Sequence, residues 1–183
     1  MGMPETRERW TAAQARELPD DGKRYEVVVG ELLVTPAPTY DHQRAVGEVY
    51  WILRRYVESI GGMDVVLSPA DIELDPRTLV QPDVFVVPID DARTGDWRRM
   101  QTLLLVAEVL SPGSARADRF TKRRRYQEAG VPLYWVVDGD DRSVEVWTPS
   151  AAFPDVERVR VTWHPAGAAR PFSLDLSELF RPL

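Results

Sequence analysis

The chain has 183 residues, of which 44% are hydrophobic and 28% charged, and these values fit one globular domain with a sizeable core. It contains no cysteine, which excludes disulfides, thiolate zinc sites and cysteine nucleophiles and is compatible with a reducing cytoplasm. The formal net charge of −6 argues against a basic nucleic-acid coat protein, but a nuclease remains open because its metal site needs acidic residues. His42 and His164 are the only histidines, so carboxylates must be the main ligands of any metal.

The first residues are charged and are followed by no apolar stretch of the kind found in secretory signals. No apolar run approaches the roughly 20 residues that a membrane-spanning helix needs. We therefore expect a cytoplasmic protein without membrane partners.

In the first third of the chain, residues 5–18 mix charged and small apolar residues and predict a short helix. Residues 25–34 consist of two apolar, β-branched runs around a glycine, and this pattern predicts a hairpin. Apolar residues then recur at helical spacing over residues 41–60, which predicts a long amphipathic helix.

Short strands are predicted next, at residues 63–67, 71–74, 84–87 and 103–110, with a polar surface loop at 90–99. The last of these strands is almost entirely apolar, as is typical of a central strand that is buried on both faces. The spacing of residues 115–129 predicts a second helix, which ends at a glycine.

The remaining segments predict a strand pair at 133–137 and 144–147, a further strand at 156–163 and a short helix at 175–180. This order indicates one α/β (α+β) domain over residues 1–183, with a central mixed sheet flanked by helices and the hairpin added near its N-terminal end. Residues 1–20 are expected to form an N-terminal helical extension.

Two acidic residues lie where a ligand could reach them, Asp83 at the start of one predicted strand and Glu108 near the end of another. An ionised carboxylate in a buried strand is costly unless it is paired or binds a metal. Two carboxylates at adjacent strand ends would suit magnesium or manganese. The alternatives are a strand-end salt bridge for Glu108 and a turn residue for Asp83.

The second helix carries Asp118, Lys122 and Tyr126 on one face, pointing toward the strand that contains Glu108. A lysine beside a carboxylate cluster could orient an attacking water and offset charge in the transition state. An ordinary i, i+4 ion pair between Asp118 and Lys122 explains the same pattern equally well.

Further residues are candidates for nucleic-acid-binding and supporting roles. Arg116, Arg119 and Arg123 form a basic stripe that could contact nucleic-acid phosphates, or could be a solvated helix face. His42 lies on the apolar stripe of the long helix, where a structural role is more common than a catalytic one. Glu26, in the hairpin, could approach the site from outside the core.

Other enzyme classes lack their signatures in this sequence. No G-x-S-x-G elbow accompanies the serines after the buried strand, which argues against a serine hydrolase. No P-loop and no G-x-G-x-x-G are present, so a role in hydrolysing nucleotides or binding dinucleotides is not expected.

Several motifs together resemble the Uma-two endonuclease family of the PD-(D/E)XK restriction-endonuclease-like superfamily. They are Tyr25-Glu26-Val27-Val28-Val29-Gly30-Glu31-Leu32, His42, Gln81-Pro82-Asp83-Val84, Glu108-Val109-Leu110-Ser111-Pro112, Asp118, Lys122, Tyr126, Gly130-Val131 and Tyr134-Trp135-Val136-Val137-Asp138. The resemblance covers roughly residues 20–180, and the string from Glu108 to Asp138 is its most specific part.

The resemblance implies a restriction-endonuclease-like core in which Asp83 and Glu108 hold a divalent metal together with the carbonyl of Val109. Leu110 stands where the superfamily's usual lysine is expected, two residues after the acid. The resemblance implies that in this family the lysine lies on the following helix instead, where this chain has Lys122.

From these observations we expect a hydrolase that cleaves nucleic-acid phosphodiesters with Mg or Mn, DNA being favoured. Asp83, Glu108 and Lys122 would be its catalytic residues, supported by His42, Glu26, Asp118 and Tyr126. The alternative is a non-catalytic binding or assembly module that retains the nuclease fold, because fold does not fix function. Strand edges and tryptophan-rich segments also permit a homodimer.

Overall fold

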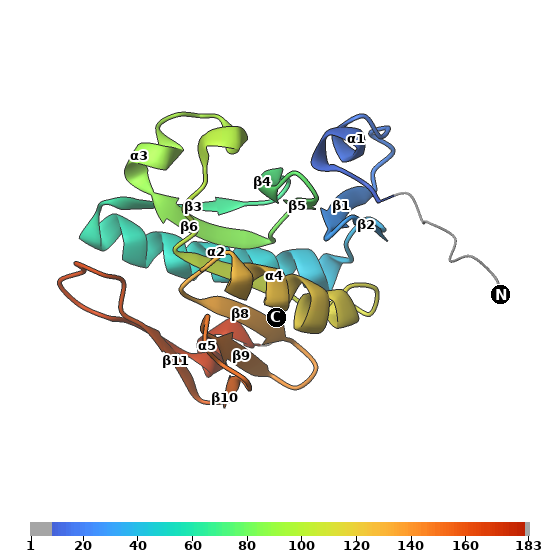
Figure 1. Cartoon of the computed structure of the whole chain (residues 1–183). Helices are drawn as coiled ribbons and strands as arrows, with labels where there is room; N and C mark the ends of the chain where they lie inside the picture. Colours follow the sequence, from blue (N-terminus) through green and yellow to red (C-terminus); the bar gives the residue numbers. More distant parts are fainter. Residues whose placement is uncertain (1–8, 182–183) are drawn as a thin grey trace.

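The computed structural model describes residues 9–181, and its centre is a six-stranded sheet in the order β10-β9-β8-β7-β6-β3 (Figure 1). Its strands are β3 (Met63–Leu67), β6 (Val84–Pro88), β7 (Leu105–Val109), β8 (Tyr134–Asp138), β9 (Ser143–Trp147) and β10 (Asp155–Glu157). Neighbours in this sheet pair antiparallel, except that β7 and β8 run parallel. The segment between these two strands must therefore cross a face of the sheet.

The two faces of this sheet bury different side chains of the same strands. On β7, Leu105, Ala107 and Val109 belong to one apolar cluster, whereas Val106 belongs to another on the opposite face. Successive residues of a strand point to opposite faces, which explains the near-continuous apolar sequence of this strand. Glu108 shares the face of Val106, so it is a carboxylate that interrupts an apolar surface.

One face is covered by α2 (Tyr40–Ile60), whose buried positions include His42, Val46, Val49 and Leu53. The side chain of Thr39 caps the helix by accepting a hydrogen bond from the His42 N–H. His42 is thereby fixed in the first turn, directed into the protein. Within residues 9–181, none of the helices is long and apolar enough to cross a membrane.

The opposite face is covered by the crossover between β7 and β8, which contains η2 (Ala117–Lys122) and α4 (Arg123–Glu128). The first of these is π-helical, with the Arg123 N–H donating to the carbonyl of Asp118. That carbonyl also accepts a 2.9 Å hydrogen bond from the hydroxyl of Tyr134 on β8. Single π-helical turns are frequent at functional sites, and this one buries both Asp118 and Lys122.

A second sheet, in the order β2-β1-β5-β4, lies beside the first (Figure 1). It comprises β1 (Arg24–Val28), β2 (Glu31–Thr35), β4 (Ile72–Asp75) and β5 (Thr78–Val80), with α1 (Ala12–Arg16) packed against it. The β1–β2 hairpin turns through Val29 and Gly30, both at positive φ, which suits a two-residue hairpin turn. Arg24 and Glu26 lie two residues apart on β1 and so share a face.

The C-terminal part adds a two-stranded sheet of β11 (Arg160–Trp163) and β12 (Phe172–Asp175), followed by α5 (Leu176–Leu179). Trp163, Phe172, Leu176 and Leu179 join the apolar cluster beneath α2. These residues close one side of the core and bring the end of the chain close to the start of α2.

Several predicted boundaries need correction. The helix expected at 5–18 is α1 only, because Thr11 is its N-cap and Glu17 its C-cap; residues 5–8 lie outside the described part. The strand expected at 156–163 is two strands, since β10 pairs with β9 whereas β11 pairs with β12. The loop expected at 90–99 contains two short helical segments, α3 (Ile89–Ala92) beginning just before it and η1 (Trp97–Arg99).

Two strands were not predicted, β5 and β12. The first has only three residues and the second, Phe172–Asp175, carries no β-branched residue, so neither produces a recognisable pattern. The mixed sheet flanked by helices agrees with the predicted fold class.

The packing of α2 generates a stability prediction. Replacing the buried Leu53 by alanine should lower the free energy of unfolding by about 2–5 kcal/mol, because the lost contacts leave a cavity. Replacing the exposed Trp51 on the same helix by alanine should change it by no more than about 0.5 kcal/mol. Urea denaturation followed by circular dichroism measures both, and equal losses would contradict this orientation of the helix.

Candidate active site

The two carboxylates singled out from the sequence meet across adjoining strands. Val84 pairs with Ala107 in the β6–β7 ladder, and this register sets Asp83 beside Glu108. The Asp83 N–H donates to Glu108 Oε2 at 3.2 Å, and the Val109 N–H donates to Asp83 Oδ2 at 2.9 Å. Both side chains are therefore held by main-chain groups of the opposite strand, with exposures of only 3% and 1%.

Asp83 also has two side-chain partners from distant elements. Arg24 Nη1, on β1, lies 2.7 Å from Asp83 Oδ1. His42 Nε2, on α2, lies 3.3 Å from Asp83 Oδ2 and 3.0 Å from the carbonyl oxygen of Val109. Burial acts to raise the pKa of Asp83, but the His42 hydrogen bond and the charge of Arg24 outweigh it and bring the pKa to about 2.

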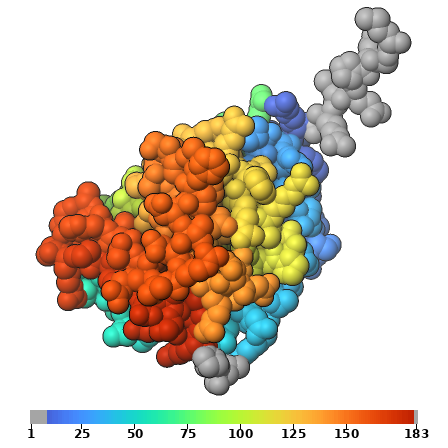
Figure 2. Space-filling view, turned by 90° about the horizontal axis from the view of Figure 1, so that it is seen from below, coloured from blue at the N-terminus to red at the C-terminus, as the bar shows by residue number. Residues whose placement is uncertain are grey.

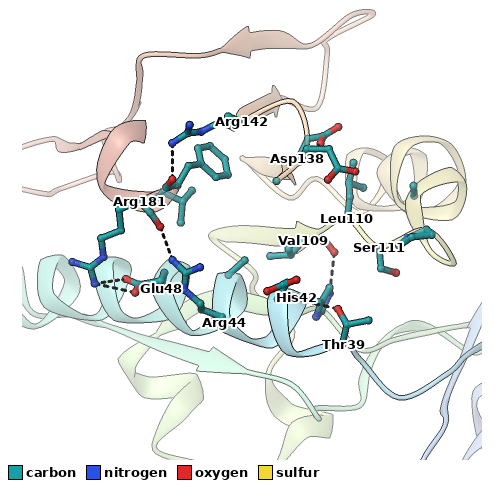
Figure 3. A pocket seen from close by; sticks show the side chains of 18 of the residues that line it. Thr39, His42, Arg44, Glu48, Val109, Leu110, Ser111, Asp138, Arg142 and Arg181 are labelled. Atoms are coloured by element: carbon teal, nitrogen blue, oxygen red, sulfur yellow. Dashed lines mark hydrogen bonds and ion pairs between the residues drawn. The ribbon is translucent and has the colours of Figure 1, made fainter. Parts of the chain in front are cut away.

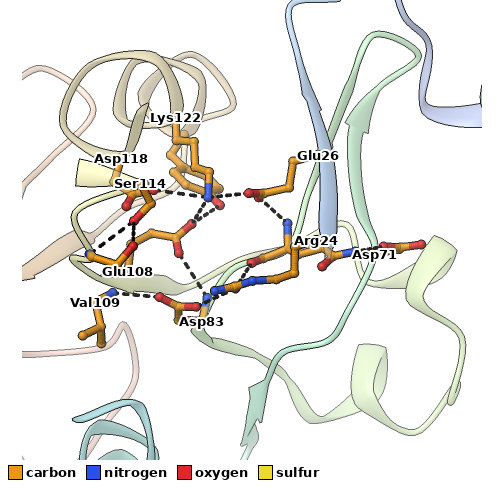
Figure 4. Close-up of polar contacts among 12 residues, drawn as sticks. Arg24, Glu26, Asp71, Asp83, Glu108, Val109, Ser114, Asp118 and Lys122 are labelled. Carbon is orange, nitrogen blue, oxygen red and sulfur yellow. Dashed lines mark hydrogen bonds and ion pairs between the residues drawn. The ribbon is translucent and has the colours of Figure 1, made fainter. Parts of the chain in front are cut away.

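Lys122 lies at the centre of a second group of contacts (Figure 4). Its Nζ is 2.8 Å from Glu26 Oε2, 3.2 Å from Glu108 Oε1 and 3.2 Å from Asp118 Oδ1. Burial alone would lower the pKa of Lys122, but the surrounding carboxylates, Glu108 foremost, raise it well above its ordinary value. The ammonium is therefore a fixed cation and hydrogen-bond donor rather than a base.

Glu26 and Tyr126 complete the surroundings of Lys122 and Glu108. The Tyr126 hydroxyl donates to Glu108 Oε1 at 3.2 Å, and the Gln81 N–H donates to Glu26 Oε1 at 2.8 Å. Segments from β1, α2, the start of β6, β7 and the η2–α4 crossover thus converge on one point. The structure places all three expected catalytic residues and all four expected supporting residues in a single buried cluster.

The charges in this cluster do not balance. Four buried carboxylates belong to it, those of Glu26, Asp83, Glu108 and Asp118, each with an exposure of 3% or less. Among residues 9–181 the permanent cations in contact with them are Lys122 and Arg24, so four minus two leaves two negative charges in excess when all four carboxyls are counted as ionised and His42 as neutral.

The excess charge affects the carboxyl groups directly. Burial raises the pKa of Glu108 well above its ordinary value in spite of Lys122, and the neighbouring Asp83, Asp118 and Glu26 raise it further. Burial likewise raises the pKa of Asp118. An added cation would relieve this repulsion.

The donor set fits a hard divalent metal ion. Residues 9–181 contain no group of three or more His, Cys, Asp or Glu side chains arranged to hold a metal. The candidate donors are instead two carboxylates, Asp83 and Glu108, and one main-chain carbonyl, that of Val109. Mg²⁺ commonly binds through one or two carboxylates and keeps several waters, so this oxygen-only set suits it. The excess of two negative charges matches the charge of such an ion.

A cavity of about 730 Å³ adjoins the cluster on the side of His42 and Val109 (Figure 3). Its walls come from the first turns of α2, the β7–η2 loop, the β8–β9 turn and the end of α5. Figure 2 shows the face of the molecule where the yellow crossover lies between the orange C-terminal strands and the blue N-terminal segments. Arg44 and Arg142 on the cavity wall donate to the main-chain carbonyls of Arg181 and Phe180, and acidic side chains, Asp41 and Asp140 among them, line the same cavity.

The basic stripe expected on the second helix is largely engaged in intramolecular contacts. Arg119 lies 2.7 Å from Asp138 and 2.6 Å from Glu145. Arg123 donates to Gln127 and lies over the ring of Trp147, 4.6 Å from its centroid. Arg116 is exposed and has no ion pair within residues 9–181, so it is the member of the stripe that stays open to solvent.

Arg24 is a cluster member that the sequence analysis did not identify, and Gln81 appeared there only within a motif and with no role of its own. Arg24 lies 59 residues before its partner Asp83, so no local spacing links them. The available signal was its position two residues before Glu26 on the same strand, which puts both side chains on one face. Gln81 contributes its main-chain N–H to Glu26 and its side-chain amide to Asp71, at 2.8 Å in each case.

Comparisons with known proteins agree with this picture. The model of the Uma2 family, described as "Putative restriction endonuclease", matches residues 12–177. A solved structure described as that of a putative nuclease belonging to DUF820, from Anabaena variabilis, is similar with a TM-score of 0.76. The two chains are 18% identical over 93% of this chain and 97% of the other, so this likeness shows the fold alone. No match was found among the curated proteins.

The charge excess predicts that removing a carboxylate stabilises the metal-free protein. At pH 8 with a chelator, Glu108→Gln should melt at least about 2 °C above wild type, since ~1 kcal/mol moves the midpoint by about 2–4 °C at this size. The raised pKa of Glu108 costs stability as the pH rises, so the advantage should shrink as the pH falls toward the ordinary range of a glutamate.

Glu48→Gln is the matched control, because Glu48 is paired with Arg181 at 2.9 Å outside the cluster. This variant should show no gain in melting temperature at either pH. A Glu108→Gln protein that melts below wild type at pH 8 would contradict the charge count.

Proposed function

Because the chain belongs to the Uma2 family, we propose that it is a nuclease that depends on a divalent metal and hydrolyses phosphodiester bonds, with DNA as the favoured substrate. One observation carries the proposal: Asp83 and Glu108 meet at adjoining strands, and the ammonium of Lys122 lies 3.2 Å from Glu108. The family description as a restriction endonuclease supports DNA over RNA.

Asp83, Glu108 and the Val109 carbonyl would hold Mg²⁺ or Mn²⁺. Such an ion supplies charge neutralisation at the phosphoryl group and acidifies water. The chain itself would contribute an environment with little solvent, in which both carboxylates are already fixed by main-chain N–H groups and the Val109 carbonyl by His42. Groups held in advance need no reorganisation at the moment of reaction.

Lys122 would act as the cation that stabilises charge developing on the reacting phosphate. Its raised pKa keeps it protonated, and Glu26 and Asp118 orient it. This position compensates for Leu110, the apolar residue at the superfamily's usual lysine place. Tyr126 fixes the Glu108 oxygen that Lys122 contacts, and His42 supports Asp83 and the Val109 carbonyl.

The cavity beside His42 and Val109 offers a route for the substrate. Arg44 and Arg142 lie on its wall among both acidic and basic side chains, and their hydrogen-bond partners are main-chain carbonyls, so both guanidinium groups could contact phosphate. Arg116, exposed on the adjoining crossover, would contact the backbone of the nucleic acid as well. Phosphate contacts of this kind position a duplex without reading its sequence.

Mutagenesis separates metal binding from phosphate chemistry. In plasmid cleavage with Mn²⁺, Asp83→Asn, Glu108→Gln and Lys122→Gln should each lose at least about 100-fold in rate, the scale for removing one preorganised charge stabiliser. Calorimetry should show that Lys122→Gln still binds Mn²⁺, whereas the two carboxylate variants do not. Lys23, the other lysine in the chain, pairs with Asp21 near the surface, and Lys23→Gln should retain full activity.

Undiminished cleavage by both Glu108→Gln and Lys122→Gln would refute the assignment. A folded wild-type protein that takes up no Mn²⁺ in the calorimeter would instead favour a non-catalytic module that keeps the nuclease fold. The 100-fold losses and the retained metal affinity of Lys122→Gln are together the signature of the proposed enzyme.

A further inference from the structure

Each oxygen of Asp83 already has a partner in this structure, and the partner of Oδ1 is a cation whose charge opposes a metal ion at the same oxygen. Oδ2 accepts the Val109 N–H at 2.9 Å, and this donor is fixed in strand β7. His42 reaches the same oxygen. Oδ1 has a single recorded partner, the guanidinium of Arg24 at 2.7 Å. Oδ1 is therefore the oxygen that can be freed by moving one side chain.

From this geometry we propose that Arg24 holds the metal's place at Asp83 and, once a divalent ion binds there, turns to a phosphate group of the substrate. The inference rests on the proposed nuclease function and adds a residue to it. Arg24 is a positioning residue for the metal-free site and a binding residue for the nucleic acid. It is none of the groups that the sequence analysis selected.

Charge explains why the exchange is favourable. Without metal, Arg24 is one of only two permanent cations beside four buried carboxylates, and Asp83 needs a positive neighbour to stay ionised while 3% exposed. A divalent ion brings two positive charges to the same carboxylate. With both cations in place, repulsion between them favours the departure of the side chain.

His42 does not need to leave for this exchange. Its Nε2 lies 3.0 Å from the Val109 carbonyl oxygen, and a carbonyl has two lone pairs. The carbonyl can therefore serve His42 and an ion together. His42 approaches from the cavity formed by α2 and the β7–η2 loop, whereas Arg24 approaches from the opposite hairpin.

Space is available for the Arg24 side chain once it leaves Asp83. It lines a separate cavity of about 530 Å³, together with the basic Arg16 and Lys23 and the acidic Asp20 and Asp71. Its Nε is buried without a hydrogen-bond partner in this structure, so the guanidinium has unused donor capacity. A planar guanidinium binds two phosphate oxygens at once, which suits a nucleic-acid backbone at the mouth of this cavity.

The test compares Arg24→Gln with Arg16→Gln. Arg16 lines the same cavity but pairs with Glu73 at 2.6 Å and does not touch Asp83. Calorimetric titration with Mn²⁺ should show at least about tenfold tighter binding by Arg24→Gln than by wild type, because no cation competes for Oδ1. Fluorescence anisotropy with a DNA duplex in Ca²⁺ should show about tenfold weaker binding by the same variant. Arg16→Gln should change each affinity by less than about twofold.

A second measurement uses the wild-type protein, so it does not depend on how the variants fold. In ¹⁵N spectra of labelled arginine, the Nε–H signal of Arg24 should move when Mg²⁺ is added, and that of Arg16 should stay in place. An Arg24→Gln protein that binds Mn²⁺ no tighter than wild type, DNA affinity that is unchanged, or an Arg24 signal insensitive to Mg²⁺ would each overturn the proposal.

These outcomes distinguish a failure of the Arg24 proposal from a failure of the proposed nuclease function. Wild-type protein that binds Mn²⁺ and cleaves DNA, combined with weaker metal binding by Arg24→Gln, overturns the role of Arg24 and leaves the nuclease intact. Wild-type protein that binds no Mn²⁺ overturns both.

Discussion

The structure depends on how a buried ammonium is shared among carboxylates from separate parts of the chain. Lys122 lies within 3.2 Å of Glu26, Glu108 and Asp118, which come from the hairpin, the central strand and the crossover. Removing a charge of this kind from water is expensive unless partners surround it. The contacts therefore tie the second sheet to the first at one point, and that point is the candidate site. The side chains that join the two sheets are therefore also those of the candidate site.

Sequence patterns went far in locating the site because the relevant spacings are short. Asp118 and Lys122 share a helix face, and Glu108 interrupts an apolar strand, so both signals are local. The helix periodicity also led to His42, which α2 directs to Asp83 at 3.3 Å. The roles proposed for these residues remain for the experiments to test.

Other features could not be predicted because they depend on contacts between distant segments. Arg24 becomes part of the candidate site only because the hairpin packs against Asp83, 59 residues later in the sequence. The engagement of Arg119 with Asp138 and Glu145 likewise follows from the crossover packing on β8 and β9, which a helical wheel does not contain. Strand β12 is defined by its pairing with β11 and has little propensity of its own.

The parallel pairing of β7 with β8 has a consequence for how such sites can evolve. Two parallel neighbours require a chain segment that passes over the sheet, and here that passage is made by η2 and α4 above Glu108. Because of this topology, residues of the crossover lie over the acidic pair, whichever side chains strand β7 has. A chain with an apolar residue at position 110 can therefore still place a cation beside Glu108, as this one does with Lys122.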